Sequence, residues 1–76
     1  MTTERYSDEL IKLGKRLQQL RKERKLTQMD MEVRSGINNG DISRIENGQK
    51  NIEFHSIVKL AAALEVELYQ LFPKCD

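Results

Sequence analysis

Polar side chains that suit the recognition of nucleic-acid bases gather in a short segment near the middle of the sequence. Asn39, Asp41 and Arg44 lie close together and, on a helix, would point away from the apolar residues Ile42 and Ile45. In the major groove of DNA, asparagine pairs with adenine, arginine pairs with guanine, and aspartate accepts a hydrogen bond from cytosine. The spacing therefore predicts a helix whose exposed face can contact base edges.

Each of these residues also has a plainer interpretation, which the sequence leaves open. Asp41 follows Asn38 by three residues, which is the spacing of a capping pair at the start of a helix. Arg44 could be an ordinary solvent-exposed helix residue. Asn39-Gly40 is also typical of a hairpin turn, but its flanks do not alternate as strands do, so the helix is favoured.

A second short helix is predicted just before this one, and a tight turn joins the two. Thr27 and Asp30 have the spacing of a capping box, which predicts a helix over about 28–35. Gly36 can adopt the left-handed conformation that ends it, and the next helix runs over about 39–47. Two helices joined by a short turn containing glycine form the unit that presents a recognition helix to DNA.

Three further helices are predicted to hold this unit in place. Leucines at spacings of three and four predict a helix over about 8–24, with Ser7 as its N-cap. A broad apolar stripe predicts a helix over 54–64, and a short helix over 67–72 follows. No segment alternates apolar and polar residues as a strand would, so the fold class is all-α, with five helices.

Length and composition limit the class of protein. Seventy-six residues allow one domain, residues 1–76, and Cys75, the only cysteine, cannot form an internal disulfide. No apolar run is long enough for a membrane span or a secretory signal, so we expect a cytoplasmic protein with no membrane contact. The net charge of +1 conceals a basic stretch, residues 12–25, with seven basic residues against one glutamate.

From about Leu13 to Phe72, the sequence resembles the lambda-repressor-like, Cro-type helix-turn-helix family. The matching stretches follow the order and spacing of the family: Leu17 with Leu20-Arg21, Leu26-Thr27-Gln28, Ser35-Gly36-Ile37, Ile42 to Gly48, Leu60 to Val66, and Leu71-Phe72. A shorter likeness is to the small stand-alone controllers of restriction–modification systems. The resemblance implies a compact five-helix domain that regulates transcription by binding double-stranded DNA.

The resemblance also implies roles for individual residues. The positions at which family members contact bases are occupied here by Asn39, Gly40, Asp41 and Arg44. The positions that contact the DNA backbone are occupied by Gln28, Ser43, Asn47, Lys50 and Asn51. In the family, the glutamine that corresponds to Gln28 also supports a side chain of the recognition helix.

Two residues depart from the family pattern. Glu32 stands where alanine usually faces the recognition helix, so its side chain must turn outward or pair with a basic group such as Arg44. A pair with Arg44 would compete with base contact by that arginine. Gly40 lacks a side chain where the family often has one that contacts a base, and glycine weakens a helix by about 0.5–1 kcal/mol relative to alanine.

We expect two copies of the chain to act together, because one recognition helix contacts too few base pairs to select a site in a genome. A two-fold homodimer predicts a near-palindromic operator with half-site centres about 10 base pairs apart. The predicted interface is the last helix with the end of the preceding one. There Val66 and Tyr69 are expected at the interface, and Leu71 and Phe72 mainly in the core.

Other classes of function are weighed against this one. An antitoxin that represses its own operon, and a protein-interaction module that keeps the fold without binding DNA, both stay open. The sequence contains no evident arrangement of nucleophile and base, so we do not expect an enzyme. His55 has no second metal ligand nearby, and we predict no metal, cofactor or small-molecule ligand.

Overall fold

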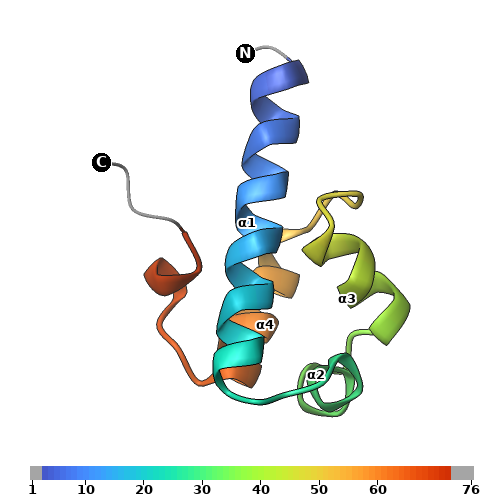
Figure 1. Cartoon of the computed structure of the whole chain (residues 1–76), viewed down its shortest axis with the longest axis vertical. Helices are drawn as coiled ribbons and strands as arrows, with labels where there is room; N and C mark the ends of the chain where they lie inside the picture. The colour runs from blue at the N-terminus through green and yellow to red at the C-terminus, as the bar shows by residue number, and fades with distance from the viewer. Residues whose placement is uncertain (1–2, 73–76) are drawn as a thin grey trace.

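Helices make up nearly all of the regular structure in the computed structural model, which describes residues 3–72 (Figure 1). They are α1 (Thr3–Glu23), α2 (Gln28–Ser35), α3 (Asn39–Glu46) and α4 (Phe54–Leu64), followed by the 3₁₀ turn η1 (Leu68–Leu71). No strand occurs within residues 3–72, which agrees with the all-α prediction. Cys75 lies outside the described residues.

The prediction of a fifth helix over 67–72 is wrong, because η1 is a single 3₁₀ turn. Glu65 closes α4 in a left-handed conformation, with φ of 59°, and Phe72 is already extended, with φ of −100° and ψ of 130°. Few residues therefore remain between the two breaks, and short segments of this kind commonly adopt the tighter 3₁₀ form.

The start of α1 was also predicted wrongly. The helix begins at Thr3, so Ser7 lies inside it and is not its N-cap. Residues 5–9 are exposed, and Tyr6 is the one apolar residue among them, so little apolar spacing marks this first part of α1, which extends beyond the other helices (Figure 1). Apolar spacing indicates the part of a helix that packs against the core, so it does not indicate where a solvent-exposed end of the helix begins.

The core lies where the four helices and η1 meet. Its largest fully buried side chains are Leu60, Leu64 and Leu71, which confirms the expectation for Leu71. The other large buried apolar residues are Leu13, Leu17, Leu20, Met31, Ile42 and Ile45. Every helix contributes to this cluster, so the apolar side of α3 is anchored and its opposite side stays exposed.

The apolar stripe of α4 faces the core only in part. Phe54 is 66% exposed and Val58 is 43% exposed, so two large apolar residues of this helix lie on the surface. Phe72, which was expected mainly in the core, is 48% exposed. A domain this small has too little interior to enclose every large apolar side chain, and some of them remain at the surface.

Candidate nucleic-acid interface

The helix-turn-helix unit has the capping that the sequence predicts. The Thr27 hydroxyl accepts a hydrogen bond from the Asp30 backbone N–H at 3.0 Å, and Asp30 Oδ2 accepts one from the Thr27 N–H at 2.8 Å. Gly36 ends α2 in the left-handed conformation, with φ of 79°, and its N–H donates to the Glu32 carbonyl. These contacts fix both ends of α2 and hence the direction in which the chain enters α3.

Hydrogen bonds with the Thr27 backbone and hydroxyl hold the pKa of the Asp30 carboxyl below its usual value. The backbone bond is the larger cause. Because these bonds favour the ionised form, the contribution of this cap to stability is complete above the ordinary aspartate pKa. It is lost as the pH falls through the lowered pKa, when protonation of Asp30 loosens the first turn of α2.

The start of α3 is capped by Asn38, as predicted, but not in a reciprocal box with Asp41. Asn38 Oδ1 accepts a hydrogen bond from the Gly40 N–H at 2.7 Å. Asp41 is instead paired with Lys50, whose Nζ lies 3.5 Å from Asp41 Oδ1, and both side chains are partly exposed. This pair joins the first turn of α3 to the loop that follows the helix.

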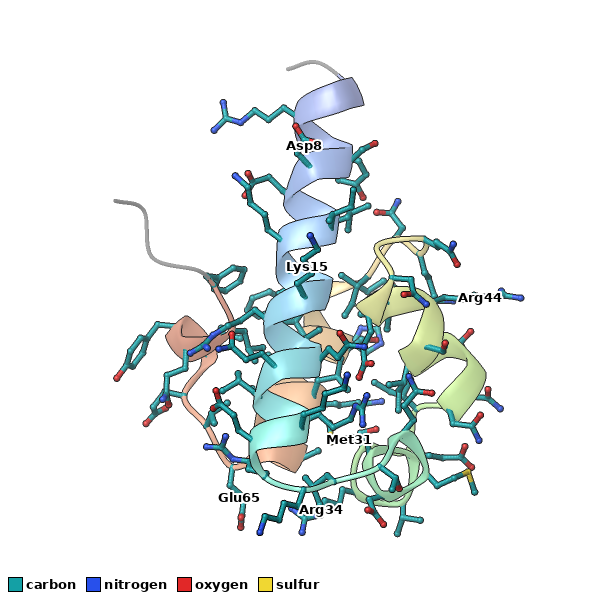
Figure 2. The ribbon with its side chains drawn as sticks, viewed as in Figure 1. Asp8, Lys15, Met31, Arg34, Arg44 and Glu65 are labelled. Atoms are coloured by element: carbon teal, nitrogen blue, oxygen red, sulfur yellow. The ribbon has the colours of Figure 1, made fainter. Side chains whose placement is uncertain are left out.

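Most of the residues predicted to contact DNA lie together on α3 and the loop after it. Arg44 lies on the outer side of α3 and is directed away from the other helices (Figure 2). The exposed residues of this set, besides Arg44, are Gly40, Asn47 and Asn51, and the half-buried ones are Asn39, Asp41, Ser43 and Lys50. These residues are therefore all at least partly accessible, on α3 and in the loop that follows it.

Gln28 is half-buried at the start of α2. Its Nε2 donates a hydrogen bond at 3.1 Å to Oε1 of Glu46 in the last turn of α3. The contact supports a side chain of α3, which is the kind of role that the resemblance implies. Contact of Gln28 with a phosphate stays a prediction.

Glu32 adopts neither of the two arrangements predicted for it. Its Oε1 accepts hydrogen bonds from the backbone N–H and from Nδ2 of Asn39, both at 2.8 Å. The partner is therefore the first residue of α3 and not Arg44. The carboxylate satisfies a backbone donor that the helix leaves unpaired, and it lies at the positive end of the α3 dipole.

A buried ion pair behind α3 was missed in the sequence. Arg21 Nε lies 2.7 Å from Glu46 Oε2, and Arg21 Nη2 lies 3.0 Å from Glu46 Oε1. Arg21 Nη1 also donates to the Leu26 carbonyl at 2.8 Å. Arg21 was counted among the basic residues of the segment 12–25, yet it is buried and joins α1 to α3.

The signal for this contact lies in the stripe of α1 that faces the core. Gly14, Leu17 and Arg21 follow one another at spacings of three and four, so the glycine and the arginine share the buried side. At Gly14 the backbones of α1 and α3 approach closely. A Cβ atom there would collide with the carbonyl oxygen of Ile45 and lie 2.7 Å from that of Glu46.

Two other arginines also make internal contacts. Arg16 Nε donates to the Gln70 carbonyl at 2.7 Å, which ties α1 to η1. Arg34 Nη1 donates to the Ala63 carbonyl at 3.0 Å, which ties α2 to the end of α4. The exposed cations of the basic segment include Lys15, Lys22 and Arg24, so less of its charge faces solvent than the count suggested.

A family model described as a helix-turn-helix domain matches residues 14–75. The HTH-type transcriptional repressor RghR of Bacillus subtilis (strain 168) is 44% identical over 54 residues, which cover 70% of this chain and 40% of RghR. The uncharacterized HTH-type transcriptional regulator y4dJ of Sinorhizobium fredii is 34% identical over 64 residues, which cover 84% of this chain and 83% of y4dJ.

A similar fold occurs in the crystal structure of the restriction–modification controller protein C.AhdI from Aeromonas hydrophila. The TM-score is 0.81 at 38% sequence identity, over 83% of this chain and 96% of that one. The chain therefore spans nearly all of this controller, whereas it spans only two fifths of the length of RghR. Within residues 3–72, no helix has the length and apolar character needed to cross a membrane.

Proposed function

Because the chain belongs to the helix-turn-helix domain family, we propose that it is a DNA-binding transcription regulator that inserts α3 into the major groove of its operator. The observation that carries this proposal is the two-sided character of α3. Ile42, Ile45 and Glu46 hold one side against the rest of the domain, while Arg44 and its polar neighbours stay accessible. A helix of this diameter fits the major groove, where polar side chains reach base edges.

Phosphate contacts would come from the loop after α3. Asn47 and Asn51 are exposed there, and Lys50 can exchange its partly exposed partner Asp41 for a DNA phosphate. Such contacts position a protein on the duplex and make binding dependent on salt, but they do not select a sequence. Selection of sequence is the task of the residues at the start and the outer side of α3.

Selection of binding sites from random duplexes tests this proposal. The purified chain is expected to enrich one near-palindromic sequence with half-site centres about 10 base pairs apart. A matched selection at higher salt should retain the same sequence at lower yield, because phosphate contacts weaken while base contacts persist. Recovery of random sequences under both conditions would contradict the proposal.

Replacement of Arg44 by alanine is expected to weaken binding to the selected operator by about 1–3 kcal/mol and to relax the preference at one base pair. The reason is that a guanidinium can bond to both acceptors of guanine in the major groove. Lys59→Ala is the matched control, since it removes an exposed charge from α4, which contains none of the residues predicted to contact DNA. An equal loss of affinity for all sequences would show that Arg44 contacts a phosphate.

We further propose that the chain binds this operator as a homodimer through exposed apolar side chains of its C-terminal half. Of the two residues predicted at the interface, Tyr69 is 74% exposed, whereas Val66 packs at the edge of the core. Phe54, Val58 and Phe72 are further exposed candidates in this half of the chain. Burial of such side chains between two copies would be favourable, since it removes apolar surface from water.

Tyr69→Asp is expected to give a folded monomer with much weaker operator binding, because it places a charge in the proposed interface. Sedimentation at tens of micromolar, with and without operator DNA, measures the change. Val33→Asp is the control, since Val33 is 82% exposed on α2 and lies outside this region. A wild-type chain that stays monomeric on DNA would rule out the dimer and the palindromic operator.

A further inference from the structure

We infer that Glu32 and Met29 fix the side-chain amide of Asn39 so that only its carbonyl oxygen is free to contact a base. Asn39 then selects a base that presents an amino group in the major groove, which is cytosine or adenine, through one hydrogen bond. The inference rests on the proposed function and specifies how one position of the operator is selected. It makes Glu32, on α2, a positioning residue for a contact made by α3.

The orientation of the Asn39 amide follows from the chemistry of its neighbours. Glu32 Oε1 lies 2.8 Å from Asn39 Nδ2 and the same distance from the Asn39 backbone nitrogen. An ionised carboxylate has acceptors only, so the amide edge that faces it must be the NH₂ group. The backbone bond holds the carboxylate in place at the start of α3, independently of the side-chain bond.

Met29 engages the same NH₂ group. Its Sδ lies 2.8 Å from Asn39 Nδ2, and a thioether sulfur is a weak acceptor with no hydrogen to donate. Met29 and Glu32 are three residues apart on α2 and therefore lie on one side of that helix. An NH₂ group has two hydrogens, and two acceptors within the protein are available to take them.

The usual pairing of asparagine with adenine requires both ends of the amide. Nδ2 donates to N7 of adenine, and Oδ1 accepts from the N6 amino group. With the NH₂ group held by Glu32 and Met29, only the bond to an amino group is left. Cytosine and adenine both offer that group in the major groove, whereas guanine and thymine present acceptors there, which would face Oδ1 unfavourably.

Operator variants that contain 7-deazaadenine test this inference, because that base lacks the N7 acceptor but keeps the N6 amino group. The operator position is found first, as the one whose preference is relaxed in Asn39→Ala. With adenine placed there, the affinity of the wild-type chain should change less than about twofold when 7-deazaadenine replaces it. Glu32→Ala frees one hydrogen of the NH₂ group to bond to N7, so this variant should lose about two- to tenfold on the same replacement, the range of one hydrogen bond.

Two further variants separate positioning from a general effect on the fold. Glu32→Gln keeps a carbonyl oxygen that can accept from Asn39, so it should stay insensitive to the loss of N7. Val33→Ala alters an exposed neighbour on α2 and should behave as the wild type. Thermal unfolding of each variant checks that the domain is folded at the assay temperature.

The possible failures point to different claims. A wild-type chain that loses affinity on 7-deazaadenine as strongly as Glu32→Ala does would overturn this inference and leave the proposed function standing. A preference for guanine or thymine at the Asn39 position, or no position relaxed by Asn39→Ala, would do the same. Failure of the chain to select any sequence would overturn the proposed function itself and this inference with it.

Discussion

Replacement of Glu46 by alanine is expected to lower the free energy of unfolding by about 3–5 kcal/mol. The variant leaves the Arg21 guanidinium buried without the carboxylate that lies 2.7 Å from its Nε. The side chains of Arg21 and Glu46 are only 11% and 3% exposed, so the guanidinium would lose its partner in a site that is largely shielded from water. A domain of this length has a free energy of unfolding of roughly 4–11 kcal/mol, so the variant would lose a large part of it.

Chemical denaturation followed by circular dichroism measures this effect, and the exposed pair of Lys12 and Glu9 provides the control. These two side chains are both 59% exposed and lie 3.4 Å apart, so Glu9→Ala should cost less than about 1 kcal/mol. The double variant Arg21→Met with Glu46→Leu should recover most of the loss, since it removes both buried charges together. Equal losses in Glu46→Ala and Glu9→Ala would show that burial of the pair is unimportant.

Gly14→Ala is expected to destabilise the domain by at least about 3 kcal/mol, the upper part of the range for overpacking. Helix propensity alone predicts the opposite sign, a gain of about 1 kcal/mol, because glycine is the poorer helix former. The close approach of α1 and α3 decides the sign of the change in stability. The new Cβ would collide with the Ile45 carbonyl oxygen and lie 2.7 Å from the Glu46 carbonyl oxygen. These are backbone atoms of α3, so α1 and α3 must move apart.

Thermal unfolding should show this loss as a fall in Tm of roughly 12–24 °C. The neighbouring residue Lys15 is exposed on the same helix, and Lys15→Ala should change Tm little. A higher Tm in Gly14→Ala would mean that helix propensity outweighs the contact and that α1 and α3 are not closely packed there. Loss of operator binding by Gly14→Ala at a temperature where it is still folded would show that this contact also positions α3.

The features of the fold that depend on local sequence could be predicted. The capping box of Thr27 with Asp30, the left-handed Gly36 and the Asn38 cap each involve residues within a few positions of one another. Such residues restrict the backbone locally, wherever the helices pack. The helix-turn-helix unit could therefore be located within the sequence before its partners in the fold were known.

The features that depend on tertiary contacts could not be predicted in the same way. Arg21 and Glu46 are 25 residues apart, so the helical spacing that places Arg21 on the buried side of α1 does not identify its partner. The pairing of Glu32 with Asn39 depends on how α2 and α3 cross, so sequence spacing could not identify the partner. The short η1 turn likewise reflects where Glu65 and Phe72 break the helical backbone.

A direct comparison of affinities tests whether α3 binds a particular DNA sequence. Anisotropy titrations at physiological salt would compare the selected operator with a scrambled duplex of the same length and base composition. We expect the operator to bind at least about 10³ times more tightly, as it does for specific regulators. Equal affinity for the two duplexes, or no binding to either, would contradict this expectation.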